Sequence, residues 1–215
     1  MRMRKKKHGA ERIGACGDLI VQNPTELLEN PQAVFAINRP LYLEIGCGKG
    51  DFITGMSIAH GDFNFIAMEK IADVACLALE KAKRTESERN DNLKFIIGDA
   101  KNLPFYFPLH CLDGIYINFC DPWPKCGHEK RRLTYKSFLQ IYKDLLKPEG
   151  MLYFKTDNAG LFDYSLTSFE EFGLKIEWFT RNLHESEKND ENIMTEYERN
   201  FSQKGVNINS AWVKF

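Results

Sequence analysis

Apolar and polar residues follow two different periods along this chain. Apolar runs of five to seven residues predict buried strands over 41–45, 64–69, 93–97, 113–119, 151–155, 174–179 and 211–215. Between these runs, apolar residues recur at helical spacing, which predicts helices over 52–60, 72–85, 134–146 and 161–172. Strands that alternate with helices predict an α/β protein with a doubly wound, mostly parallel seven-stranded sheet and an antiparallel C-terminal strand.

Turn and loop signals separate these elements. The sequence Lys-Pro-Glu-Gly at 147–150 predicts a turn that ends the helix over 134–146, and the polar stretch 182–192 predicts a mobile loop. The first residues lack a strong period and contain Pro24 and Pro31. We therefore predict a basic N-terminal arm and connector over 1–39, followed by one domain over 40–215, which suits a chain of 215 residues.

The charges are unevenly distributed although the formal net charge is only −1, which argues against a uniformly basic nucleic-acid-binding protein. Residues 1–12 carry six lysines and arginines against one acid, and a second basic run lies over 125–136. The segment 185–198 is acidic. A basic face of this kind suits an anionic polymer as partner, with a solvated surface as the alternative for each run.

The six cysteines form no C-x-x-C pair, which is typical of a reduced intracellular protein and predicts a cytoplasmic location. Cys120, Cys126 and His128 share one loop without a second pair of ligands, so we expect no metal site. No apolar run approaches the length of a membrane span, and the basic N-terminus lacks the apolar core of a signal peptide, so we expect no membrane association.

A glycine loop follows the first predicted strand. Glu44 comes two residues before Gly46, and Gly48 and Gly50 follow at intervals of two. The spacing differs from the dinucleotide pattern G-x-G-x-x-G, and Asp51 at the helix start would repel a pyrophosphate. An acid before the glycines suits a ligand with a positive group, and the pattern resembles the first motif of S-adenosylmethionine-dependent methyltransferases. A dinucleotide enzyme and a purely structural turn are the alternatives.

Acidic residues also end the second and third predicted strands, where ligands bind in open α/β sheets. Glu69 stands where an acid can accept the two hydroxyls of an adenosine ribose. Asp99 can accept the exocyclic amine of adenine, and Ala100 leaves room for the ring. The alternatives are a surface acid for Glu69 and a turn residue for Asp99.

The fourth predicted strand leads into Asp121-Pro122-Trp123-Pro124, where two prolines stiffen a loop that presents a carboxylate and an aromatic ring. Such a loop suits a planar substrate. It continues into basic residues that suit phosphates: Lys125, His128, Lys130, Arg131 and Arg132.

Two further segments carry polar residues that we expect in the same ligand-binding crevice, at the carboxyl ends of the strands. Asp157 follows the fifth predicted strand, and the sequence Thr-Glu-Tyr-Glu lies at 195–198. Thr195 and Glu198 have the spacing of a capping box at a helix start, which is the structural alternative to a ligand contact.

Together these segments resemble the bacterial tRNA (guanine-N7-)-methyltransferase family, and the match covers nearly the whole chain in the family's order. The most specific pieces are Asp-Pro-Trp-Pro-Lys at 121–125, Lys-Arg-Arg-Leu at 130–133 and the late Thr-x-Tyr-Glu. The resemblance implies a Rossmann-like fold and methyl transfer to N7 of a guanosine in the variable loop of tRNA, at position 46 of the tRNA. The stretch 126–129 is less basic than is usual in the family.

The resemblance also implies roles for single residues. S-adenosylmethionine would be bound by Glu44, Gly46, Gly48, Glu69, Asp99, Ala100 and Asp121, of which Asp121 is the catalytic acid. The tRNA would be bound by Lys125, Lys130, Arg131, Arg132, Asp157, Thr195, Glu196, Tyr197 and Glu198. The oligomeric state would be a monomer or a homodimer.

Guanine N7 carries a lone pair and no proton, so its methylation needs alignment and loss of water rather than a general base. The product ring is cationic, and the carboxylates of Asp121 and Asp157 would favour that charge. Two other functions stay open. One is an amino-methylating nucleic-acid methyltransferase, because Asp-Pro-Trp-Pro loosely resembles the Asp-Pro-Pro-Tyr loop of those enzymes. The other is a non-catalytic RNA-binding protein on the same fold.

Overall fold

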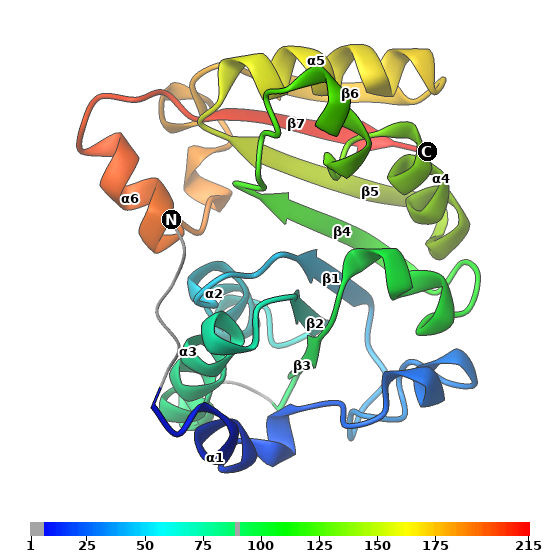
Figure 1. Ribbon diagram of the computed structural model, residues 1–215, viewed down its shortest axis with the longest axis vertical. Coiled ribbons are helices and arrows are strands. Elements are labelled where there is room, and N and C mark those ends of the chain that lie inside the picture. Colours follow the sequence, from blue (N-terminus) through cyan, green and yellow to red (C-terminus); the bar gives the residue numbers. More distant parts are fainter. Residues whose placement is uncertain (1–6, 89–90) are drawn as a thin grey trace. The chain divides into compact units, whose positions relative to one another are not determined.

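The computed structural model describes residues 7–88 and 91–215. The chain divides into two compact units, Met1–Pro108 and Leu109–Phe215, and each has its own strands and helices (Figure 1). The boundary expected after residue 39 stays a prediction.

The first unit is built on three parallel strands in the order β3-β2-β1. These are β1 (Leu41–Ile45), β2 (Asn64–Glu69) and β3 (Leu93–Ile97), and their bounds agree with the predicted ranges. Each strand is almost entirely buried because its residues are apolar on both faces. Helix α2 (Asp51–Ala59) follows β1 and α3 (Ala72–Arg84) follows β2, so the carboxyl ends of all three strands lie at one edge.

The segment before β1 packs on this unit rather than forming a separate arm. It contains α1 (Gly9–Gly14) and two 3₁₀ helices, η1 (Gly17–Leu19) and η2 (Pro24–Leu28). Leu19 and Leu27 are buried, and Arg12 forms two hydrogen bonds of 2.7 Å with Glu80 of α3. Residues 9–28 thus contain helical segments that pack on the first unit, while residues 1–6 with most of the basic run lie outside the described residues.

The second unit holds four strands in the order β4-β5-β7-β6. Strands β4 (Leu112–Asn118) and β5 (Leu146–Thr156) are parallel, whereas β7 (Asn209–Lys214) is antiparallel to both β5 and β6 (Lys175–Thr180). The helices are α4 (Lys136–Leu145), α5 (Ala159–Glu171) and α6 (Glu196–Ser202). The described residues thus hold seven strands, mostly parallel, and the predicted fold class with its antiparallel C-terminal strand is confirmed.

Two local predictions need correction. The predicted turn at 147–150 lies inside β5 as a bulge, because β4 pairs Leu112 with Leu146 and then Gly114 with Met151. Glu149 takes the positive φ of 71° that this extra length requires. The predicted mobile loop over 182–192 contains two 3₁₀ helices, η6 (Leu183–Glu185) and η7 (Asn189–Glu191), and the Leu183 side chain is buried.

Candidate active site

The glycine loop after β1 needs glycine for two different reasons. Gly46, Gly48 and Gly50 have φ values of 78°, 57° and 78°, a left-handed conformation that other residues rarely adopt. A Cβ atom added to Gly46 or Gly48 would meet nothing within 4 Å, so the backbone there is open to a ligand. A Cβ on Gly50 would lie 2.8 Å from the Cβ of Ala78, so this glycine lets the start of α2 pack against α3.

Two carboxylates flank this loop. Glu44 is only 1% exposed near the end of β1. Glu69 accepts the backbone N–H of Gly48 at 3.0 Å and that of Ile71 at 2.8 Å. Burial, together with the charges of Glu44 and Glu69, raises the pKa of the Cys47 thiol. The structure thus brings Glu44, Glu69 and the glycines together, and the local charge favours a cationic ligand.

Asp99 begins the 3₁₀ helix η4 (Ala100–Phe105) and caps it by accepting the backbone N–H of Lys101 at 3.0 Å. Its other oxygen accepts from Lys70 Nζ at 2.7 Å, a partner that the sequence did not predict. Burial opposes ionisation, but the hydrogen bonds from Lys70 and Lys101 hold the pKa of the Asp99 carboxyl below its usual value. Ala100 beside it is 8% exposed. An adenine amine at Asp99 would share this carboxylate with the exposed Lys70.

The edge of the first unit suits a positively charged ligand better than a pyrophosphate. Asp51, the first residue of α2, pairs with Lys81 Nζ at 2.6 Å, so a carboxylate occupies the helix start where a dinucleotide would place its phosphates. The open Gly46–Gly48 backbone and the carboxylates of Glu44 and Glu69 fit S-adenosylmethionine, which carries a sulfonium, an ammonium and a ribose but no phosphate.

In the second unit, β4 ends in a loop with two unusual backbone conformations. Phe119 has a φ of 54° and Trp123 a φ of 42°, values uncommon for aromatic residues. The side chain of Asp121 between them is exposed. Burial and the charge of Asp121 raise the pKa of Cys120 to about 12, so this thiol is protonated at neutral pH and is no nucleophile.

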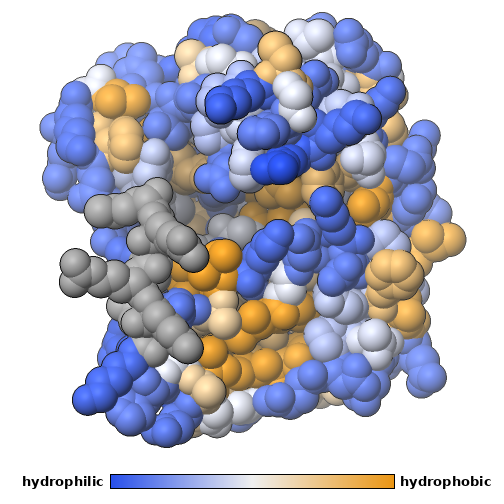
Figure 2. Space-filling model, viewed as in Figure 1, coloured by the Kyte–Doolittle hydropathy of each residue, from blue (hydrophilic) through white to orange (hydrophobic). Residues whose placement is uncertain are grey.

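The basic run after this loop separates into two groups. Lys125, Lys130 and Arg131 are exposed, and the Arg131 guanidinium lies 4.8 Å from the ring centroid of Trp123. They flank or belong to the 3₁₀ helix η5 (Cys126–Arg131), over which the surface is mostly hydrophilic (Figure 2). These three residues remain available to phosphates.

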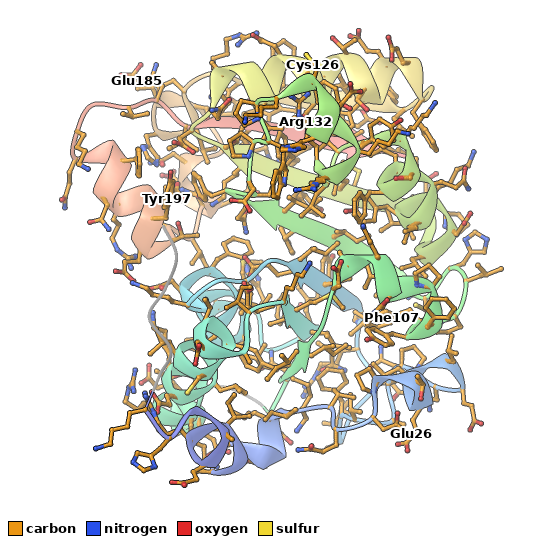
Figure 3. The ribbon with its side chains drawn as sticks, viewed as in Figure 1. Glu26, Phe107, Cys126, Arg132, Glu185 and Tyr197 are labelled. Carbon is orange, nitrogen blue, oxygen red and sulfur yellow. The ribbon has the colours of Figure 1, made fainter. Side chains whose placement is uncertain are left out.

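Arg132 belongs to the second group, because its side chain turns back onto the protein (Figure 3). Its Nε donates to the carbonyl of Pro122 and its Nη2 to the carbonyl of Trp123, both at 3.1 Å. The same guanidinium lies 4.1 Å from the ring centroid of Tyr164 on α5. The structure thus places the Arg132 side chain against its own unit rather than among the exposed basic residues.

Asp157, after β5, meets the start of α6. Tyr197 donates its hydroxyl to Asp157 Oδ2 at 3.2 Å, and burial together with Asp157 raises the pKa of Tyr197 to about 12. The Tyr197 ring stacks on Phe201 at 4.3 Å and tilts against Phe119 at 5.1 Å between centroids. The structure thus joins Asp157 to Tyr197 and adds two aromatic rings that sequence reasoning missed.

Glu198 is the centre of a buried polar network. Its carboxylate accepts from Lys155 Nζ at 2.9 Å and Asn192 Nδ2 at 2.7 Å, and His184 Nε2 lies 2.9 Å away. Burial favours the neutral acid, but the charge and hydrogen bond of Lys155 hold the pKa of Glu198 below its usual value. The Glu198 side chain is fully buried, and its ion pair with Lys155 joins the start of α6 to β5.

The predicted capping box is confirmed at the same place. The Thr195 hydroxyl accepts the backbone N–H of Glu198 at 2.8 Å, and Glu198 Oε2 accepts that of Thr195 at 3.4 Å. Glu196 is the first residue of α6 and is half-buried. Of the residues that contact Glu198, the sequence drew attention to Lys155 only because it lies two residues before Asp157. No feature of the sequence pointed to His184 or Asn192.

Within residues 7–88 and 91–215, no group of three or more His, Cys, Asp and Glu side chains has the arrangement of a metal site. The helices in this part of the chain are all too short or too polar to cross a membrane.

The chain is similar to known methyltransferases. Residues 38–211 match the family model described as putative methyltransferase. The tRNA (guanine-N(7)-)-methyltransferase of Lactococcus lactis subsp. cremoris (strain SK11) is 42% identical over 100% of this chain and 98% of its own. The enzyme of the same name from Limosilactobacillus fermentum (strain NBRC 3956 / LMG 18251) is 45% identical over 97% of this chain and 95% of its own.

The solved structures show a similar fold. The 16S rRNA methyltransferase KamB superposes with a TM-score of 0.60, covering 82% of this chain and 87% of that one at 12% identity. Such a likeness confirms the Rossmann-like fold alone. The extent and identity of the sequence matches go further: this chain belongs to the family of putative methyltransferases and, within it, to the tRNA (guanine-N(7)-)-methyltransferases.

Proposed function

We propose that this protein is an enzyme that transfers the methyl group of S-adenosylmethionine to N7 of a guanosine in the variable loop of tRNA. The observation that carries the proposal is the 42% identity, over the full chain, with a curated tRNA (guanine-N(7)-)-methyltransferase. The carboxylates beside an open glycine backbone and the exposed Asp121 support it independently.

In this proposal the first unit holds the cofactor. Gly46 and Gly48 offer open backbone, Glu69 accepts the ribose hydroxyls, and Asp99 with Ala100 receives the adenine. Glu44 supplies buried negative charge for a positive group. When bound, S-adenosylmethionine supplies an electrophilic methyl group on a sulfonium. Asp121 is assigned to the cofactor as well.

The second unit provides the groups for guanine. N7 has no proton to lose, so no residue needs to act as a base on it. Asp121 and Asp157 favour the positive charge that develops on the ring, and either carboxylate can accept from the N1 and N2 donors that distinguish guanine from adenine. Because the Tyr197 hydroxyl donates to Asp157, it fixes the direction of that carboxylate.

Lys125, Lys130 and Arg131 are the phosphate contacts in this proposal, since their side chains are exposed. The start of α6 faces the RNA in this proposal, with Thr195, Glu196 and Tyr197. Glu198 holds that helix in place through its buried hydrogen bonds. The cytoplasmic location and the choice between monomer and homodimer stay predictions.

Methyl transfer to tRNA tests the whole proposal. The protein is incubated with methyl-labelled S-adenosylmethionine and tRNA from a strain that lacks N7-methylguanosine, and the nucleosides are then separated. The label is expected in N7-methylguanosine. Label in an amino-methylated base would instead identify an amino-methylating enzyme, and cofactor or RNA binding without any transfer would identify a non-catalytic RNA-binding protein.

Glu69→Gln is expected to weaken cofactor binding. The amide keeps one acceptor for the Gly48 N–H but loses the charge that strengthens hydrogen bonds to ribose hydroxyls, a loss of about 1.5–3 kcal/mol. Calorimetry with S-adenosylhomocysteine measures the change, and Glu86→Gln on the surface of the same unit is the matched control. An unchanged dissociation constant in Glu69→Gln would remove Glu69 from the cofactor site.

Lys130→Ala combined with Arg131→Ala is expected to make tRNA binding less sensitive to salt. Each lost phosphate contact lowers the slope of log affinity against log salt by up to about 1. The measurement is tRNA binding by filter retention across a salt series, with the exposed Lys143→Ala of α4 as control. Equal slopes in all three proteins would show that the basic run is only a solvated surface.

A further inference from the structure

The loop that carries Asp121 holds a conformation that its own residues do not favour. Trp123 has a φ of 42°, although residues before a proline prefer extended backbone, and Pro124 follows directly. Strained backbone of this kind persists only where the surrounding structure holds it in place. The support must therefore come from outside the loop.

Arg132 supplies that support with one planar group. Its two hydrogen bonds of 3.1 Å go to the carbonyls of Pro122 and Trp123, which lie on either side of the Trp123 α carbon. A guanidinium can make both bonds at once because its N–H groups point in fixed directions, whereas a lysine ammonium is a single point of charge. The contact thus restrains the backbone of the residue in the left-handed conformation.

The guanidinium is itself held by α5. Its carbon lies 4.1 Å from the ring centroid of Tyr164, and the Tyr164 hydroxyl donates to Glu129 Oε1 at 3.1 Å. Burial and the charge of Glu129 raise the pKa of Tyr164 to about 12, so the hydroxyl keeps its proton. The backbone carbonyl of Glu129 accepts the N–H of Arg132 at 2.9 Å, so Arg132, Tyr164 and Glu129 are linked to one another.

We infer that Arg132 is a positioning residue: together with Tyr164 it fixes the Asp-Pro-Trp-Pro loop, and so Asp121, in the conformation used for methyl transfer. It acts through the loop backbone and contacts neither tRNA nor cofactor. The inference rests on the proposed function for the role of Asp121. The arrangement of Arg132, Tyr164 and the loop rests on the contacts above alone.

Kinetics separate positioning from phosphate binding. Arg132→Lys keeps the positive charge but cannot make both hydrogen bonds to the loop at once. We therefore expect kcat on tRNA at saturating cofactor to fall by about 10-fold or more. The slope of log tRNA affinity against log salt should stay at the wild-type value. Tyr164→Ala should lower kcat in the same direction, and the double variant should lose less than the two effects combined, because both act through one contact.

Conservative variants complete the set. Tyr164→Phe keeps the ring under the guanidinium and should retain most of the rate that Tyr164→Ala loses. Arg181→Lys changes an exposed arginine of the same unit, paired with Asp163 at the surface, and should leave kcat unchanged. An Arg132→Lys variant with full kcat and a salt slope reduced by about 1 would make Arg132 a phosphate contact and overturn the inference.

Limited proteolysis tests the loop without any activity. Lys125 is an exposed trypsin site directly after the loop, and Arg132→Lys preserves every trypsin site of the wild type. Circular dichroism first checks that both proteins are folded. Cleavage after Lys125 is then identified by mass spectrometry, and it should be several-fold faster in Arg132→Lys than in the wild type. An unchanged cleavage rate would show that Arg132 does not hold the loop. If the wild type fails to methylate tRNA, the proposed function falls, and this cleavage rate still decides the role of Arg132.

Discussion

Replacement of Lys155 by methionine is expected to lower the free energy of unfolding by about 3–5 kcal/mol, because it leaves a buried carboxylate without its counter-charge. The Lys155 side chain is 8% exposed and that of Glu198 is fully buried. Their 2.9 Å ion pair joins the end of β5 to α6. Asn192 and His184 remain beside Glu198 in the variant, but the charge and hydrogen bond of Lys155, which hold the pKa of Glu198 down, are lost.

The same strand offers a matched control. Lys147 of β5 pairs with Asp113 at 2.8 Å, but its side chain is 42% exposed, so Lys147→Met should cost less than about 1 kcal/mol. Urea unfolding at pH 7 measures both variants. Adding Glu198→Gln to Lys155→Met should recover a large part of the loss, since the buried charge is then gone. Equal losses in the two lysine variants, or no recovery in the double variant, would show that the buried pair has no special weight.

The parallel strands of the first unit could be predicted from the sequence because their signal is local. An apolar run that is buried on both faces needs no knowledge of its partners, and β1, β2 and β3 have the predicted bounds. Their carboxyl ends then placed Glu44, the glycines and Glu69 near one another without any long-range information. The hydrogen bond from the Gly48 N–H to Glu69 shows that these residues do lie together.

The roles of charged residues in the second unit could not be predicted in the same way. Arg132 was assigned to the RNA because a basic run suits phosphates, and Glu198 because the family resemblance implies a substrate contact. In the structure Arg132 also contacts Tyr164 on α5, and Glu198 contacts Lys155 on β5, two residues that lie far away in sequence. A motif shows that such residues matter, but only tertiary contacts decide whether they touch a ligand or hold the residues that do.

The bulge at 147–150 is a third kind of difference. The segment contains Pro148 and Gly150, and both residues disfavour a regular strand, so a turn was the reasonable prediction. The parallel pairing of β4 with β5 instead resumes at Met151, and Lys147 within the intervening residues pairs with Asp113 of β4. Sheet pairing therefore overrides the local turn signal.

Asp121→Asn is expected to lower the rate of methyl transfer by about 10²-fold or more, the scale of losing one preorganised electrostatic contact. Asparagine keeps the shape of the side chain and its hydrogen-bonding capacity but not its charge, so the positive charge that grows on the guanine ring loses a stabilising partner. The side chain is exposed, and folding is therefore expected to survive the change.

Single-turnover kinetics on tRNA with saturating cofactor measure this step without contributions from product release. Asp163→Asn, an exposed acid on α5 that pairs with Arg181 at the surface, is the matched control and should transfer methyl at the wild-type rate. The rate of Asp121→Asn should also stay low from neutral to alkaline pH. Guanine N7 has no proton to lose, so Asp121 does not act as a base, and a higher concentration of hydroxide cannot replace it. If Asp121→Asn instead transfers methyl as fast as the wild type, Asp121 is a binding residue at most. Asp157, held by the Tyr197 hydroxyl, then becomes the carboxylate to test.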